Sequence, residues 1–126
     1  MKEEDGRMNE DLKDRTRRFA LEVIRLSGSL PKTTEAQVIG KQVLRSGTSV
    51  GAHYREAQRA KSDADFISKI EGGLQELDET AYWLELLVES GISDELHMAD
   101  LRNECDELTA IFVTISKKSK KQEKTK

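Results

Sequence analysis

Apolar residues recur every three or four positions along most of the chain, which is the spacing that lines one face of an α-helix. Polar and glycine-containing segments divide this pattern into four stretches. The sequence therefore predicts four helices, each with one apolar stripe. The stripe residues are Leu12, Thr16, Phe19, Val23 and Leu26 in the first; Ile39, Val43, Val50, Tyr54 and Ala57 in the second; Ile67, Ile70, Leu74, Leu77, Ala81, Leu84 and Val88 in the third; and Met98, Leu101, Cys105, Leu108, Phe112 and Ile115 in the fourth.

The segments between the stripes contain residues that end and start helices. Gly28, with a proline three residues later, predicts that the first helix ends just before it, because Gly adopts the left-handed conformation found after helix C-termini. Thr34 is the expected N-cap of the second helix, and Ser62 that of the third. Gly91 then ends the third helix, and the polar residues 93–95 start the fourth.

The second helix contains a stretch of weak helix propensity. Residues 46–52 are mostly Ser, Thr and Gly, and each Gly inside a helix costs about 1 kcal/mol relative to Ala. Small side chains also allow another helix to approach closely, which packing can reward. We predict a continuous or slightly kinked helix.

The third stripe alternates spacings of three and four over three heptads, which is typical of helix bundles. Four such helices joined by short turns bury all their stripes when neighbours run antiparallel. The sequence thus predicts an all-α protein, an antiparallel up-down-up-down four-helix bundle over residues 11–116. Residues 1–10 are polar and expected to be frayed, and residues 117–126 are Lys-rich and expected to be a disordered tail.

Composition agrees with a small helical protein. The chain has 126 residues, one Pro and 36% charged residues, and its mean hydropathy is −0.68. No apolar run approaches the roughly 20 residues that cross a bilayer, and residues 1–12 lack the apolar stretch of a secretory signal. We therefore expect a cytoplasmic protein without a membrane partner.

The net charge of −3 is unevenly distributed. Residues 117–126 hold six Lys and one Glu, so the remainder of the chain is acidic. Such a segment is either a solvated extension or an arm that binds nucleic acid. A second group of cations lies around the second helix, and phosphate is its candidate partner; the alternative is ion pairing with Glu71, Glu76 or Glu79 of the third helix. This group consists of Lys41, Arg45, Arg55, Arg59 and Lys61.

An aromatic pair interrupts the regular pattern of the third helix. Tyr82 and Trp83 lie off the apolar stripe, and Leu86 and Leu87 widen the apolar arc of the helix. A helix that is apolar on more than one side requires a second partner. Self-association is the simplest candidate, with Tyr82, Trp83 and Leu86 at the interface.

The sequence offers no catalytic or metal-binding grouping. His53 and His97 lie on different predicted helices, and the paired Glu-x-x-His motifs of a di-iron bundle are missing. Cys105 lies within an apolar stripe, where a thiol is usually an inert core residue. No phosphate-binding loop or nucleophile elbow is present. We expect no metal, no cofactor and no enzymatic activity.

Several segments resemble a known family. The stretch 42–52, continuing through 56–58, resembles the bacterial four-helix bundle family that includes proteins encoded in 23S rRNA intervening sequences. The segments 62–69, 79–84 and 89–91 are similar to the third helix of that family, and together the resemblance covers residues 12–118. It implies a ring-shaped homopentamer without enzymatic activity. A more distantly similar branch comprises accessory proteins of diversity-generating retroelements, whose basic pentamers bind nucleic acid and a reverse transcriptase.

Two functional hypotheses follow. The first is a non-catalytic homo-oligomeric scaffold, pentameric as in the relatives, that binds RNA or DNA through the cations of the second helix and the Lys-rich segment. The alternative is a protein-protein adaptor with no nucleic-acid role. The first predicts that Arg45, Arg55 and Arg59 are exposed on one face; the second predicts that they form internal ion pairs.

Overall fold

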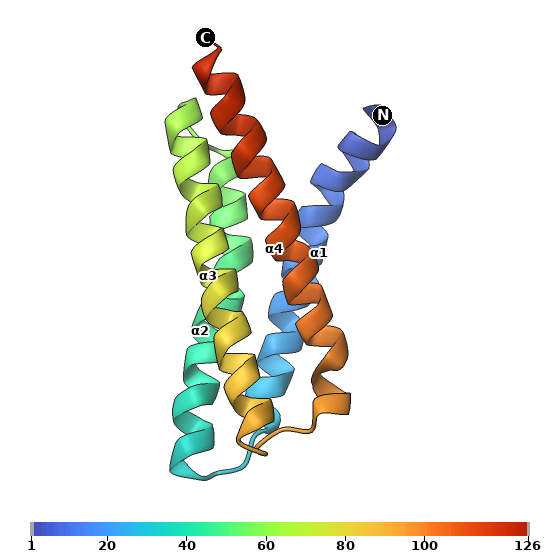
Figure 1. The fold of residues 1–126 in the computed structure, drawn as a ribbon, viewed down its shortest axis with the longest axis vertical. Coiled ribbons are helices and arrows are strands. Elements are labelled where there is room, and N and C mark those ends of the chain that lie inside the picture. The colour runs from blue at the N-terminus through green and yellow to red at the C-terminus, as the bar shows by residue number, and fades with distance from the viewer. Residues whose placement is uncertain (1, 126) are drawn as a thin grey trace.

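The protein, seen here in a computed structural model, is described for the backbone of residues 2–125 and for the side chains of residues 12–125. It forms four helices in alternating directions (Figure 1). They are α1 (Lys2–Ser29), α2 (Thr34–Gln58), α3 (Asp63–Glu89) and α4 (Glu95–Lys124). The close packing joins α1 to α2, α2 to α3 and α3 to α4. The predicted all-α, antiparallel four-helix bundle is confirmed.

Most helix ends lie close to their predicted positions, but the predicted stop at Gly28 is wrong, because α1 continues through Gly28 to Ser29 and Gly28 has no positive φ. Ser62 caps α3 as predicted, its side chain accepting a hydrogen bond of 3.0 Å from the Asp65 backbone N–H. Gly91 follows α3 with a φ of +80°, the left-handed conformation expected of it. The N-cap of α2 is Thr33, one residue earlier than predicted, and the N-cap of α4 is Asp94.

Helix α2 continues through residues 46–52 without a break, and a continuous helix was one of the two predicted forms. The glycines of this helix face α1 at close range. A Cβ atom added at Gly47 would lie 2.7 Å from Val23 Cγ2, and one at Gly51 would lie 3.1 Å from Thr16 Oγ1. The close approach of α1 and α2 therefore offsets the low helix propensity of the segment.

The predicted stripes form the core. Every stripe residue is buried or partly buried, including Phe19 and Phe112 at 1% exposure or less. Small and polar residues also enter the interior, where Ser46 Oγ and Thr80 Oγ1 are 2.7 Å apart. Either hydroxyl can be the donor, since Thr80 Oγ1 also lies 2.8 Å from the Glu76 carbonyl oxygen and Ser46 Oγ lies 3.5 Å from that of Val43. This hydrogen-bonded pair connects α2 to α3 within the core.

Helix α4 extends further than the sequence suggested. It continues through residues 117–124, the segment expected to be a disordered tail. Buried Ser116 donates a 3.1 Å hydrogen bond to Glu71 Oε2 on α3, and Lys120 Nζ lies 2.5 Å from the same oxygen. Lys is a good helix former, and no Gly or Pro interrupts the segment. The side chains of residues 1–11 lie outside the described part, so the expected fraying of residues 1–10 stays a prediction.

Over the part of the chain that the structure describes, no helix combines the length and the apolar character needed to cross a membrane.

Candidate nucleic-acid interface

Arg45 is held by two carboxylates of α3. Its guanidinium lies 3.2 Å from Glu76 Oε1 and also pairs with Glu79, while half of the side chain remains exposed. The ion pairing that the sequence offered as the alternative to phosphate binding is therefore present at Arg45. A ligand phosphate would have to compete with both glutamates for this guanidinium.

The other cations of α2 are exposed and form no ion pair with the residues described. These exposed residues are Lys41, Arg55, Arg59 and Lys61. At 100° per residue, Lys41, Arg45, Arg55 and Arg59 lie within one outward-facing arc of α2. Lys41 and Arg59 are separated by 18 residues, or about 27 Å along the helix, so the charges form a sparse row. A role of these residues in binding nucleic acid stays a prediction.

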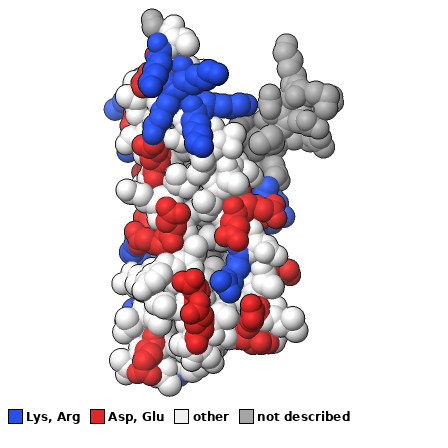
Figure 2. All heavy atoms as spheres, in the orientation of Figure 1, with Lys and Arg blue, Asp and Glu red and all other residues white. Residues whose placement is uncertain are grey.

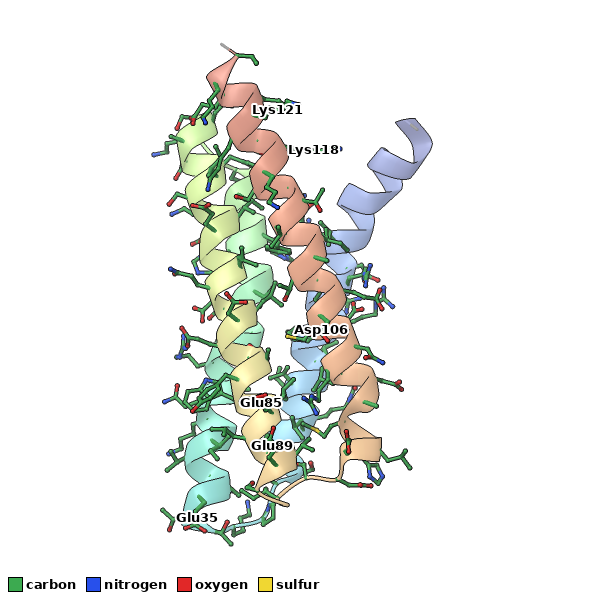
Figure 3. The ribbon with its side chains drawn as sticks, viewed as in Figure 1. Glu35, Glu85, Glu89, Asp106, Lys118 and Lys121 are labelled. Atoms are coloured by element: carbon green, nitrogen blue, oxygen red, sulfur yellow. The ribbon has the colours of Figure 1, made fainter. Side chains whose placement is uncertain are left out.

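A denser group of cations lies at the end of α4. Four lysines, hereafter the α4 lysines, are exposed and form no ion pair with any side chain that the structure describes: Lys117, Lys118, Lys121 and Lys124. Lys118 and Lys121 project from α4 on the side away from α3 (Figure 3). Lys117, Lys121 and Lys124 follow the i, i+4, i+7 spacing and therefore lie along one side of the helix.

Acidic residues dominate the rest of the same face. Figure 2 shows basic side chains gathered at the end of the molecule where α4 terminates, with acidic side chains below them. The labelled acids of this lower region are Glu35, Glu85, Glu89 and Asp106 (Figure 3). On this face, the end of the bundle where α4 terminates is thus basic and the opposite end is acidic. An extended polyanion is attracted to the first and repelled by the second.

Glu71 on α3 contacts Ser116 and Lys120 in the part of α4 that carries the α4 lysines. The hydrogen bond from Lys120 lowers the pKa of the Glu71 carboxyl, aided by the hydrogen bond from Ser116, while partial desolvation opposes the shift. Glu71 therefore stays ionised near neutral pH and holds Lys120. Lys120 is thus held on the α3 side of the helix, whereas the α4 lysines are exposed to solvent.

The predicted interface residues form an apolar patch on α3, hereafter the outer α3 patch. Tyr82 is 52% exposed, and Trp83 and Leu86 are partly buried. The Tyr82 and Trp83 rings are tilted with centroids 5.1 Å apart. Leu87, which the sequence placed in the same arc, is instead fully buried in the core. No contact with another chain is described, so the role of the patch stays a prediction.

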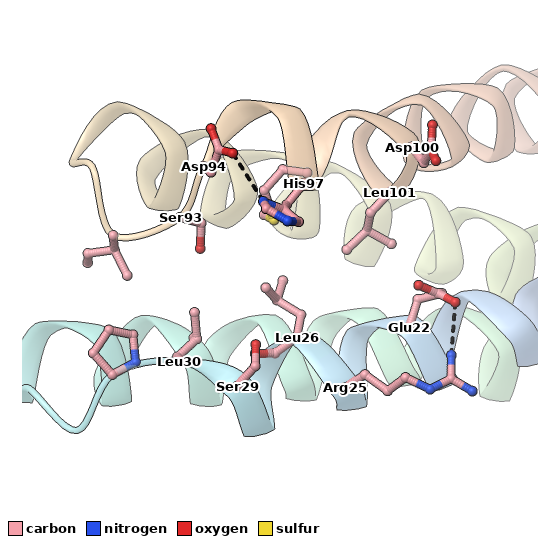
Figure 4. Close-up of a pocket in the computed structure, with 13 residues that line it drawn as sticks. Glu22, Arg25, Leu26, Ser29, Leu30, Ser93, Asp94, His97, Asp100 and Leu101 are labelled. Atoms are coloured by element: carbon pink, nitrogen blue, oxygen red, sulfur yellow. Dashed lines mark hydrogen bonds and ion pairs between the residues drawn. The ribbon is translucent and has the colours of Figure 1, made fainter.

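A groove runs between α1 and α4, which pack less closely than the other neighbouring helices (Figure 4). Its volume is about 490 Å³, and its apolar lining includes Leu26, Leu30 and Leu101. Toward the other end of these helices, Arg15 bridges to α4 by bonds of 2.6 Å and 3.2 Å to Glu104 and Glu107. The groove is partly open, and among its lining residues Arg25 Nη1 lies 2.9 Å from Glu22 Oε1.

The histidines serve different local contacts. His53 packs its ring on Gly72, where an added Cβ would lie 2.9 Å from His53 Cε1, and its Nδ1 lies 3.2 Å from Glu56 Oε1 without hydrogen-bond geometry. His97 Nδ1 lies 3.1 Å from Asp94 Oδ2 at the groove. Among the residues described, no three His, Cys, Asp or Glu side chains form a group suited to a metal ion.

Cys105 is buried in the core, as the stripe predicted. Burial raises the pKa of its thiol to about 12, with smaller contributions from Asp106, Asp78 and Glu104. The thiol is therefore protonated at neutral pH, and its Sγ lies 3.5 Å from the Leu77 carbonyl oxygen. This environment suits packing rather than nucleophilic chemistry.

Sequence reasoning identified the lysines of residues 117–126 but not their arrangement. Their charge was evident, whereas the helix that aligns them contacts Glu71, which lies 45 residues before Ser116 in the chain. The i, i+4, i+7 spacing of Lys117, Lys121 and Lys124 was the available signal. It is informative only once the segment is known to be helical.

Comparisons with known proteins agree with the resemblance found in the sequence. The family model described as 23S rRNA-intervening sequence protein matches residues 9–114. Among solved structures, the chain is similar to a protein of unknown function from the S23 ribosomal protein family of Bacteroides thetaiotaomicron. The two share 38% identity with a TM-score of 0.81, over 86% of this chain and 97% of the other. No curated protein is significantly similar. The chain belongs to the 23S rRNA-intervening sequence protein family.

Proposed function

We propose that the protein is a non-catalytic, cytoplasmic, homo-oligomeric scaffold that binds nucleic acid through the basic end of each subunit. The observation that carries the proposal is the group of α4 lysines, four exposed ammonium groups on the last two turns of a helix that form no ion pair with the described side chains. Ammonium groups in this state exchange counterions for phosphates at little cost to the fold. The basic end is therefore the favoured site.

The cations of α2 contribute less in this proposal. Arg45 already pairs with Glu76 and Glu79, and Lys41 lies about 27 Å along α2 from Arg59. Arg59 and Lys61 lie where α2 ends, at the same end of the bundle as the end of α4 (Figure 1). These two residues extend the basic surface, whereas Lys41 and Arg45 lie outside it.

Self-association is supported by the outer α3 patch. Tyr82 leaves half of its surface in water, although the neighbouring Trp83 and Leu86 provide an apolar surround. Covering such a patch with a second copy removes apolar area from water, at about 25 cal/mol for each Å². The family resemblance implies a ring of five. Five basic ends on one assembly would multiply weak phosphate contacts through avidity.

The test is a pair of measurements on one purified sample. Light scattering gives the mass, to be compared with 14.3 kDa for one chain, and fluorescence anisotropy gives binding to mixed RNA at low and physiological salt. We expect an oligomer whose RNA affinity falls steeply as salt rises. An oligomer that does not bind RNA at low salt would instead favour the protein-protein adaptor. The ion pairs of Arg45 with Glu76 and Glu79 are the observation that supports this alternative.

A further inference from the structure

The chemistry of the basic end restricts the kind of nucleic acid that it can recognise. The α4 lysines carry compact point charges that bind phosphate but offer no planar surface for a base. Proteins that bind unpaired strands add aromatic side chains on which the bases stack. The described aromatic residues near this end are turned inward: Tyr54 is 3% exposed, Phe112 is fully buried, and Phe66 is partly buried against the core.

The exposed aromatic side chain lies elsewhere. Tyr82 is two thirds of the way along α3, toward the acidic end where α3 terminates. Asp78 and Glu85 lie four residues before and three residues after Tyr82 on α3, and both are exposed. A strand that extended from the α4 lysines to Tyr82 would therefore enter an acidic part of the surface. Stacking is therefore separated from the phosphate-binding charges.

Charge density then decides between paired and unpaired ligands. Lys117 and Lys124 are seven positions apart, which corresponds to about 10 Å along the helix. Over that length a duplex presents about six phosphates and one strand about three, since the charge spacings are roughly 1.7 Å and 3.4 Å. Without stacking to compensate, the ligand with more phosphates in reach binds more tightly.

We propose that the α4 lysines form a backbone-reading surface for double-helical nucleic acid, which prefers a duplex to its separated strands and does not distinguish sequences. This inference rests on the proposed function and specifies its ligand. On the face shown in Figure 2, the acidic side chains below the lysines repel a duplex that would lie along the bundle. The duplex instead crosses the basic end.

The experiment compares four ligands under one set of conditions. They are a labelled 24-base-pair RNA duplex, a DNA duplex of the same sequence, and the two RNA strands alone, designed without self-pairing. At 100 mM salt we expect the duplexes to bind at least about fivefold more tightly than either strand, and within about threefold of each other. A second, scrambled duplex should bind equally.

Two matched double variants locate the site. Lys118→Gln with Lys121→Gln removes two charges from the basic end, and Lys32→Gln with Lys41→Gln removes two exposed charges outside it. If one subunit uses four lysines, duplex affinity falls about 150-fold between 50 and 200 mM salt. The first variant should reduce that fall to about 12-fold, and the second should leave it unchanged.

The outcomes separate this inference from the proposed function. Failure to bind any of the ligands at 50 mM salt would overturn both. The inference would be overturned if single strands bound as tightly as the duplex, or if the protein bound the RNA and DNA duplexes with very different affinities. Nucleic-acid binding itself would stand in both cases. Equal salt dependence in the two double variants would overturn the assignment to the α4 lysines. Circular dichroism of both variants checks that the helices remain.

Discussion

At the scale of single residues, the close packing of α1 and α2 depends on glycines, which leave room for the side chains of the facing helix. Gly47 faces Val23 on α1, and an added Cβ would lie 2.7 Å and 2.8 Å from the two Val23 methyl carbons. Val23 is fully buried and branched at Cβ, so it has little freedom to turn away. Gly28, by contrast, has no atom within 4 Å of the position that its Cβ would occupy. Two glycines of similar appearance in the sequence therefore have different roles.

We predict that Gly47→Ala lowers the free energy of unfolding by up to about 2 kcal/mol. Overpacking costs about 1–3 kcal/mol, and roughly 1 kcal/mol of helix propensity offsets part of it. Gly28→Ala should be neutral or stabilising by up to about 1 kcal/mol, because it gains propensity without a clash. Urea denaturation at one protein concentration measures both. Equal stability of the two variants would show that α1 and α2 can separate slightly without cost.

At the scale of elements, local patterns predicted what depends on local chemistry. The apolar spacing gave the four helices, and Ser62 and Gly91 marked the ends of α3 because capping and a positive φ involve neighbouring residues. Thr33 and Thr34 are chemically equivalent caps in the sequence, so their order could not be decided there. The end of α4 has the helix propensity of its lysines, but the contacts of Ser116 and Lys120 with Glu71 on α3 lie far apart in the chain, and no local pattern contains them.

The contact with Glu71 gives a prediction for the end of α4. Glu71→Gln removes the ion pair with Lys120, so hydrogen exchange in residues 117–124 should become faster. An exposed pair contributes about 0.5–1 kcal/mol, which corresponds to about twofold to fivefold lower protection. Glu89→Gln, an exposed change near the far end of α3, is the matched control and should leave this segment unaffected.

The same contact predicts a pH dependence. Because the folded-state pKa of Glu71 lies below its ordinary value of 4.5, the ion pair is intact above that pH and is lost as pH falls through the lowered pKa. Protection factors of residues 117–124 should therefore decrease in acid in the wild-type protein, with no such step in Glu71→Gln. An acid step of equal size in both proteins would assign it to another carboxylate.

At the scale of the whole molecule, the proposed self-association would strengthen the effect of the charge polarity. The basic end lies at one extremity of the bundle and the outer α3 patch lies along its side (Figure 1, Figure 2). In a ring whose rotation axis runs parallel to the long axis of the bundles, all subunits point the same way, and their basic ends lie on one rim. A single subunit offers few phosphate contacts, whereas the rim offers several at a high effective concentration. Loss of the oligomer should therefore weaken nucleic-acid binding even when every lysine is retained.

Tyr82→Glu tests this connection. In an oligomer joined through the outer α3 patch, the new carboxylate would be buried without a partner, at a cost of several kcal/mol, and the mass should fall toward 14.3 kDa. The isolated bundle should keep its unfolding temperature, since Tyr82 is half exposed. Leu96→Glu introduces the same charge at another exposed apolar residue, 84% exposed on α4, and should leave the mass unchanged. If Tyr82→Glu retains the wild-type mass, the interface lies elsewhere; if it becomes a monomer yet binds duplex as tightly as before, avidity has no part in the function.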